Sequence, residues 1–316
     1  MANVEVINGG MLSTIQDSGR YGYQEIGINV SGFADDYNAR IANLLVGNDK
    51  DEAVIEMAFL GSSFKFNEAM LIAITGADFS ANINGEAVEN YRSYLVKEGD
   101  ELNLAAAKNG FRGYIAFGGE IDVPVVNGSK STNLKTAIGG YEGRKLMTDD
   151  SFDVKVSEDK KERKLSLKYI NQYSKFSELR VVRGPQDDAF TDKGIFDFFN
   201  SGGYTVTKDF DRMGIRLSGN KIAHKESADI ISDGTALGSI QVPSNGQPII
   251  LFVDRQTTGG YTKIGTVITA DIHKLGNLNY KDKIIFTEVR PEEANKIARD
   301  YYETFETIAK ELNSWI

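Results

Sequence analysis

The sequence predicts a mainly β fold of barrels or sandwiches with a few helices. Short apolar or alternating runs recur along the chain, and turn residues separate them. The 316 residues include 32 glycines, and pairs such as Asn84-Gly85 and Asn109-Gly110 suit β-turns that need a positive φ. Long helices do not alternate with the strands, as they would in a doubly wound fold. The expected strands cover residues 4–7, 64–66, 70–75, 80–83, 91–95, 101–104, 111–117, 179–183, 204–207, 249–253 and 284–288.

Three segments are expected to be helices. Residues 35–46 carry apolar side chains at helical spacing, start with two aspartates where the helix dipole favours acids, and stop at Gly47. Residues 186–199 have similar spacing, although Gly194 weakens the case for an unbroken helix. The segment from Pro291 is amphipathic and begins with a proline suited to a first helical turn. We expect it to cover an apolar surface.

The length suits two domains, since domains usually hold about 100–200 residues. Hydrophobic residues make up 41% of the chain and charged residues 26%, as in ordinary folded proteins. A charged stretch at residues 157–164 offers no core face and indicates a linker or a surface excursion. The predicted domains are residues 1–155 and 170–316, and residues 156–169 connect them.

Composition excludes several function classes. The net charge is −9 and no basic block stands out, so no nucleic-acid partner is expected. Cysteine is absent, and the only histidines are His224 and His273, so we expect no thiolate nucleophile and no metal site. No run approaches the ~20 apolar residues of a membrane span, and the N-terminus does not resemble a signal peptide. We expect a cytoplasmic protein without a membrane partner, with His224 on its surface.

The segment 239–261 is typical of a small-molecule site, because an apolar strand lies between two polar, glycine-bearing turns. Asp254 is expected to emerge where that strand leaves the core. Gly259 and Gly260 would allow the backbone to turn sharply and to approach a ligand closely. Gln241 offers both a donor and an acceptor to an amide, and Asp233 is expected in the same neighbourhood.

Two further patterns leave alternatives open. Gly-Tyr-x-x-Ile-Gly occurs at residues 22–27 and again at 260–265, either as an internal repeat or as two unrelated turns. The turn at residues 128–132 is either a nest for a carboxylate or a phosphate, or a plain hydroxyl-rich turn.

A pair of arginines provides a third pattern. In a strand over residues 211–217, Arg212 and Arg216 would share one face. Such a face suits a carboxylate ligand or an acidic partner, and it also suits a salt-bridged barrel exterior.

Several strings together carry a family resemblance; they span residues 14–22, 75–78, 128–132, 139–144, 183–186, 211–217, 238–243 and 254–261. The chain resembles the C subunit of 5-oxoprolinase, the Kip-type antagonist family. That family is similar to allophanate hydrolase subunit 2 and to the carboxyltransferase part of urea amidolyase. Lys130 stands where the family usually has arginine, which exchanges a bidentate fork for a point charge.

The resemblance implies two tandem cyclophilin-like β-barrel domains and an enzyme that works as a complex. Members of that family act with the B and A subunits of 5-oxoprolinase, and together they use ATP to hydrolyse the amide substrate 5-oxoproline to L-glutamate. We expect the ATP contacts to lie on a partner subunit or to be shared with a partner subunit. One alternative is a regulatory antagonist that binds the B-type partner protein. Another is a biotin-dependent carboxyltransferase acting on a urea-like amide, and biotin is a cofactor only in that case.

The residues that we predict in the site follow from these strings. Asp254 would orient or activate the amide or water, Gln241 and Tyr261 would bind the amide, and Lys263 or Arg20 would balance developing negative charge. Asp17 either binds substrate or holds Arg20 as a structural pair. Predicted catalytic residues are Asp254, Gln241 and Lys263; predicted substrate-binding residues are Asp17, Arg20, Ser129, Thr132, Arg212, Thr258 and Tyr261.

Overall fold

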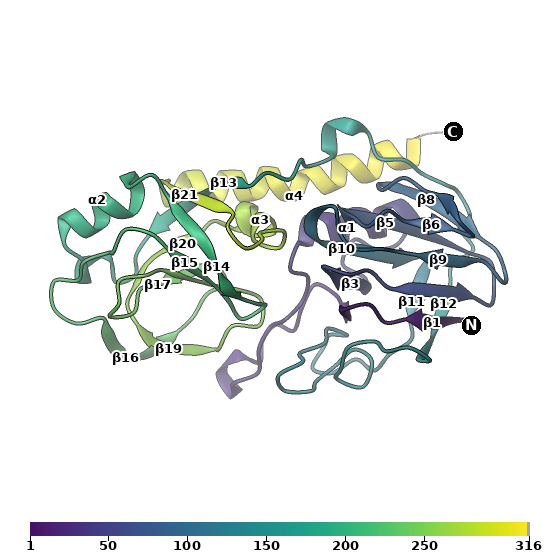
Figure 1. Cartoon of the computed structure of the whole chain (residues 1–316), viewed down its shortest axis with the longest axis horizontal. Helices are drawn as coiled ribbons and strands as arrows, with labels where there is room; N and C mark the ends of the chain where they lie inside the picture. Colours follow the sequence, from purple (N-terminus) through teal and green to yellow (C-terminus); the bar gives the residue numbers. More distant parts are fainter. Residues whose placement is uncertain (315–316) are drawn as a thin grey trace. The chain divides into compact units, whose positions relative to one another are not determined.

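The computed structural model describes residues 1–314 and confirms the mainly β fold class. The chain divides into two compact units (Figure 1). Unit 1 comprises Met1–Arg20, Ser31–Tyr173 and the residues from Glu303 onward, and unit 2 comprises Tyr21–Val30 and Ser174–Tyr302. The segments of the two units are therefore interleaved along the chain, whereas the sequence suggested a single connector. The predicted connector belongs to unit 1, where Arg163 and Leu165 are buried and most of the charged side chains at residues 157–164 are exposed.

Unit 1 contains two antiparallel sheets. The seven-stranded sheet has the order β11 (Gly119–Ile121), β12 (Ser151–Val156), β1 (Ala2–Asn8), β4 (Ser63–Phe66), β9 (Glu101–Asn103), β6 (Asn82–Ile83) and β7 (Glu86–Ala87). The five-stranded sheet has the order β2 (Leu12–Gln16), β3 (Val54–Ala58), β10 (Asn109–Phe117), β5 (Met70–Asp78) and β8 (Arg92–Val96). Buried aromatic and aliphatic side chains from both sheets form one core.

Helix α1 (Asp36–Val46) packs on β5 and β10 and confirms the first helix prediction. The Asp35 side chain accepts a hydrogen bond from the backbone N–H of Asn38, as an N-cap should. Gly47 ends the helix with a left-handed φ of 82°. Both ends were therefore predictable from the sequence.

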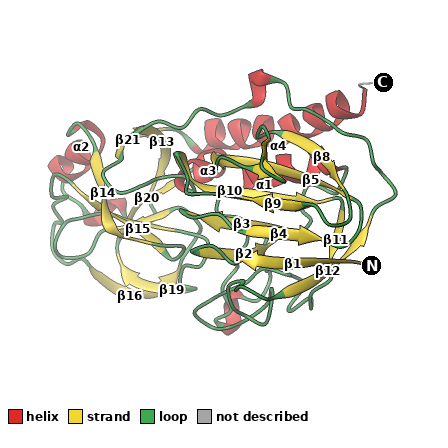
Figure 2. Ribbon diagram, turned by 45° about the vertical axis from the view of Figure 1, so that its right-hand side comes forward, coloured by secondary structure: helices red, strands yellow, loops and turns green. Residues whose placement is uncertain are grey.

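Unit 2 is built around a closed barrel. Its strand order is β13 (Phe176–Arg183), β20 (Lys263–Val267), β17 (Ser239–Gln241), β18 (Ile249–Leu251), β15 (Gly214–Ser218), β14 (Tyr204–Phe210) and β21 (Lys283–Glu288). β13 and β21 run parallel, and the other neighbours are antiparallel. A separate two-stranded ribbon is formed by β16 (Asp229–Gly234) and β19 (Thr258–Tyr261), which lie side by side (Figure 2).

The helices of unit 2 differ in part from expectation. The predicted helix over residues 186–199 is broken: a 3₁₀ turn (Asp187–Ala189) precedes α2 (Asp192–Asn200). Thr191 starts α2 by accepting a hydrogen bond from the N–H of Gly194. A Cβ at Gly194 would lie 2.6 Å from the carbonyl oxygen of Ala223, so close packing requires glycine there.

The remaining helices are α3 (Ile272–Leu275) and α4 (Pro291–Ser314). α4 begins at Pro291 and buries Phe305, Ile308 and Leu312, which confirms the predicted amphipathic helix. None of the helices within residues 1–314 is both long and apolar enough to cross a membrane.

Candidate functional site

A row of side chains crosses four neighbouring strands of the unit 2 barrel. Arg216 on β15 pairs with Ile249 on β18, Ile249 pairs with Gln241 on β17, and Gln241 pairs with Lys263 on β20. Directly paired residues point to the same face of a sheet, so these four share a face. The alternating residues are buried in the barrel core: Ile215, Leu217, Ile240, Ile250 and Ile264. The row therefore lies on the outer face of the barrel.

The β16–β19 ribbon approaches one end of this row. A Cβ at Gly259 would lie only 2.4 Å from Nε2 of Gln241, so β19 passes directly against that amide. Gln241 and Lys263 are each 2% exposed although they lie on an outward face. The sharp turn predicted at Gly259 and Gly260 is wrong, because both residues belong to a strand. Glycine is needed at 259 for close approach to Gln241.

A pocket of about 480 Å³ opens beside the row, and its lining comes from unit 2. Ile249 and Leu251 contribute apolar surface, and Gly214 adds no side chain. The uncharged polar groups at the pocket are Gln241, Gln256 and Tyr261; the charged ones are Lys208, Asp209, Asp211 and Arg216. Apolar surface with a few polar groups is typical of small-molecule sites. The structure thus brings together two residues predicted to bind the amide, Gln241 and Tyr261.

The Gln241 amide has an unused donor. Its Oε1 accepts from Nε2 of Gln256 at 3.5 Å, and its own Nε2 is buried without a hydrogen-bond partner in residues 1–314. A buried donor without a partner is costly and rare in folded proteins. A ligand carbonyl in the pocket would supply the missing acceptor.

Lys263 and Asp233 form an ion pair next to Gln241. Nζ of Lys263 lies 3.0 Å from the Asp233 carboxylate, and the amide of Gln186 contacts both residues. The hydrogen bond from Lys263 lowers the pKa of the Asp233 carboxyl. The predicted proximity of Asp233 and Gln241 is confirmed, with Lys263 linking them.

Asp254 and Arg212 lie outside the pocket lining and pair with each other. Nε and Nη2 of Arg212 donate to the two oxygens of Asp254 at 2.8 and 3.2 Å. Both side chains are at least 90% buried. The prediction that Arg212 shares a face with Arg216 is wrong, because Arg212 precedes β15 and is buried, whereas Arg216 lies within β15 and is exposed. Asp254 was predicted to emerge where the strand leaves the core, but it is buried, and its carboxylate accepts hydrogen bonds from Arg212.

Thr258 occupies an exposed position at the start of β19, opposite Gly234 of β16.

The repeated Gly-Tyr-x-x-Ile-Gly string adopts two different structures. Residues 22–27 include the 3₁₀ turn η1 (Gln24–Ile26), whereas residues 260–265 run through β19 and β20. The string therefore marks no structural repeat.

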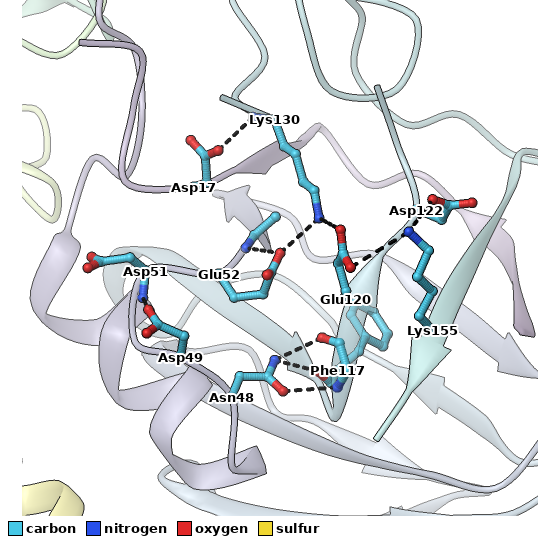
Figure 3. A network of polar contacts seen from close by, with 12 residues as sticks. Asp17, Asn48, Asp49, Asp51, Glu52, Phe117, Glu120, Asp122, Lys130 and Lys155 are labelled. Atoms are coloured by element: carbon cyan, nitrogen blue, oxygen red, sulfur yellow. Dashed lines mark hydrogen bonds and ion pairs between the residues drawn. The ribbon is translucent and has the colours of Figure 1, made fainter. Parts of the chain in front are cut away.

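The turn at residues 128–132 holds a carboxylate from within unit 1 (Figure 3). Asp17 accepts hydrogen bonds from the hydroxyls of Ser129 and Ser131 and from the backbone N–H of Lys130 and Gly19. A phosphate at this turn would compete with Asp17 for the same donors. The turn therefore binds a carboxylate of the protein itself, and its role toward an external ligand stays a prediction.

Neighbouring residues of unit 1 stabilise the same turn. Nζ of Lys130 pairs with Glu52 at 3.0 Å and with Glu120 at 2.8 Å (Figure 3), and the Lys130 hydrogen bond lowers the pKa of Glu120. Arg20, 1% exposed, donates to the carbonyls of Val126 and Ser131.

Thr132 donates its hydroxyl to the carbonyl of Ile15. Together, the hydrogen bonds of these unit 1 residues support backbone structure. Within residues 1–314, no group of acidic and histidine side chains is arranged to hold a metal ion.

Two residues of the pocket lining, Gln256 and Arg216, were not among the predicted site residues. Gln256 lies only two residues after Asp254, inside a string that carried the family resemblance. Arg216 alternates with Ile215 and Leu217, which signals an outward-facing strand position. Neither of these sequence features shows that Gln256 and Arg216 line the same pocket.

Comparison with known proteins gives a consistent result. A family model described as the carboxyltransferase domain, subdomain A and B, matches residues 26–288. The chain is 36% identical to the 5-oxoprolinase C subunit of Escherichia coli, across 98% of this chain and 99% of that protein. It is 33% identical to the 5-oxoprolinase C subunit of Haemophilus influenzae, across 98% of this chain and 100% of that protein. The crystal structure of K. lactis urea amidolyase matches 97% of this chain with a TM-score of 0.92 and 28% identity, although the match covers 20% of that longer chain.

Proposed function

The chain belongs to the carboxyltransferase-domain family, and we propose from this membership that it is the C subunit of an ATP-dependent 5-oxoprolinase. Its substrate would be 5-oxoproline and its product L-glutamate. Its partners would be the A and B subunits of the same enzyme. The cysteine-free composition suits the reducing cytoplasm, where we place the complex.

The observation that carries the proposal is the buried Nε2 of Gln241 at the pocket. A lactam presents one strong acceptor, its carbonyl oxygen, and Gln241 offers one unused donor. In this proposal Gln241 donates to that oxygen, while Tyr261 contacts the ring. Lys263 lies beside Gln241 and would stabilise negative charge that develops on the same oxygen.

The other predicted residues receive different roles. We assign Asp254 to holding Arg212 in place, because both of its oxygens accept from that guanidinium. Asp17 and its neighbours would maintain the fold of unit 1.

An unactivated lactam is a poor electrophile, and ATP would supply the chemistry that makes its carbonyl carbon reactive toward water. We place the ATP contacts on the partner subunits, since Asp17 fills the one turn of this chain that suggested a phosphate site.

Reconstitution tests this function. Glutamate release from 5-oxoproline and ATP would be measured with the A and B subunits, with and without this chain. Gln241→Leu removes the donor at nearly constant volume and should lower kcat/KM by about 100-fold, since a site built to hydrogen-bond its substrate depends strongly on that bond. Gln172→Leu, an exposed change in unit 1, is the matched control and should behave as the wild type. Turnover that does not require this chain would refute the proposal.

A further inference from the structure

We propose that Arg216 binds the carboxylate of the substrate, so that the unit 2 pocket selects small cyclic amides that carry a carboxylate. This inference rests on the proposed function and identifies a specificity-determining residue for it. Arg216 would hold the acidic end of the ligand, and Gln241 would hold the amide end.

Arg216 differs from other arginines of unit 2 in its contacts. Arg212 pairs with Asp254, Arg180 with Asp271, and Arg183 with Asp187 and Glu288. The Arg216 guanidinium has no ion pair or hydrogen bond to any other residue in the described part of the chain, and it lines the pocket. Its planar fork can therefore bind a carboxylate in bidentate fashion.

Strand register sets the spacing between the two ligand contacts. Arg216 and Gln241 lie on strands that flank β18, and both pair with Ile249. Two strand spacings separate their backbones by about 10 Å, and both side chains line the same pocket. A small ring resting on Ile249 would fit between them.

The chemistry of 5-oxoproline matches this arrangement. Its ring nitrogen lies between the carbon that bears the carboxylate and the carbonyl carbon, so the two oxygen-bearing groups point away from each other. The methylene carbons of the ring are apolar and suit Ile249 and Leu251 at the pocket. Urea has no carboxylate and would leave Arg216 without a contact.

The other charges of the pocket do not replace Arg216. Nζ of Lys208 lies 5.6 Å from the centre of the Tyr280 ring, a cation–π contact. The Asp211 carboxylate accepts from the backbone N–H of Met213 and Gly214. Asp209 is exposed, and its charge would oppose a bound carboxylate.

Calorimetry on the full chain tests the inference with two probes, 5-oxoproline and 2-pyrrolidinone, the same lactam without the carboxylate. The wild type should bind 5-oxoproline more tightly. Arg216→Gln should weaken 5-oxoproline binding by about 10- to 100-fold and leave 2-pyrrolidinone binding unchanged. Lys221→Gln, an exposed change in unit 2 outside the pocket lining, is the control for charge alone and should leave both affinities unchanged. Asp209→Asn should tighten 5-oxoproline binding. Unchanged unfolding midpoints would show that the variants fold.

Failure of this inference and failure of the proposed function give different results. Equal affinity of the wild type for the two probes, absence of 5-oxoproline binding, or normal binding by Arg216→Gln would each overturn the role of Arg216, even if glutamate release required this chain. Carboxylate-dependent binding that Arg216→Gln abolishes would support the inference, even if the reconstituted subunits released no glutamate.

Discussion

Gly259→Ala should disable the pocket by displacing Gln241. The added Cβ would lie 2.4 Å from Nε2 of Gln241, whereas ordinary contact begins near 3.4 Å. The difference, 3.4 − 2.4, is about 1 Å, and either the amide or β19 must move by that amount. Misplacement by about 1 Å can lower a rate about 100-fold, and overpacking costs about 1–3 kcal/mol of stability. We therefore expect a loss of about two orders of magnitude in kcat/KM for 5-oxoproline with the fold retained.

Gly260→Ala is the matched control, because its Cβ would meet Ile230 and Ser232 at 3.5 and 3.7 Å, which are ordinary contacts. Both variants would be assayed for glutamate release in the reconstituted complex and for unfolding by urea. Adding Gln241→Ser to Gly259→Ala should restore stability without restoring activity, since the shorter side chain removes the overlap. A Gly259→Ala variant with wild-type kcat/KM would refute the assignment of Gln241 to the substrate.

Three further predictions concern residues away from the amide. Asp254→Asn should lower the free energy of unfolding by about 3 kcal/mol, because it removes the charge that balances buried Arg212. In urea denaturation, the double variant Arg212→Met with Asp254→Leu should recover most of the lost free energy. A double variant as unstable as Asp254→Asn would contradict the stabilising role of the ion pair. Asp17→Asn should lower the free energy of unfolding by about 2 kcal/mol, because hydrogen bonds to the carboxylate are lost, and it should leave KM for 5-oxoproline unchanged. A raised KM would instead indicate that Asp17 binds the substrate. Burial lowers the pKa of His224, so the folded state resists its protonation and stability should fall as pH drops below about 6.5. His224→Gln should lose this pH dependence of the unfolding midpoint, and its persistence would assign the effect to another group.

The fold was predictable where local chemistry decides it. Asp35 and Gly47 mark the ends of α1 by capping, which depends on neighbours in sequence. The break before α2 follows from Thr191, whose side chain starts a new helix. His224, predicted on the surface, is half-buried and packs against Phe190 with the ring centres 4.6 Å apart and the rings tilted, a contact between residues distant in sequence.

The candidate site was predictable in composition more than in arrangement. Gln241, Tyr261 and Lys263 fall within one stretch, and their uncharged or isolated polar character indicated a pocket. Arg212 and Arg216 could not be separated from the sequence, because the start of β15 falls between them and only the structure shows where it lies. Asp17 could not be matched with residues 128–132 for a similar reason, since more than 100 residues separate the partners.

The buried amide of Gln241 connects stability with function in this pocket. An unpartnered donor costs about 1–3 kcal/mol, and Gln241 bears that cost because β19 covers it. A ligand carbonyl would remove the cost, so 5-oxoproline should raise the unfolding temperature of the chain. Without ligand, Gln241→Leu should be at least as stable as the wild type, because binding sites often reduce the stability of a protein. With 5-oxoproline, the unfolding temperature of Gln241→Leu should not change. A Gln241→Leu variant that is less stable than the wild type would instead mean that the amide supports the barrel, and the pocket would lose its main evidence for a ligand.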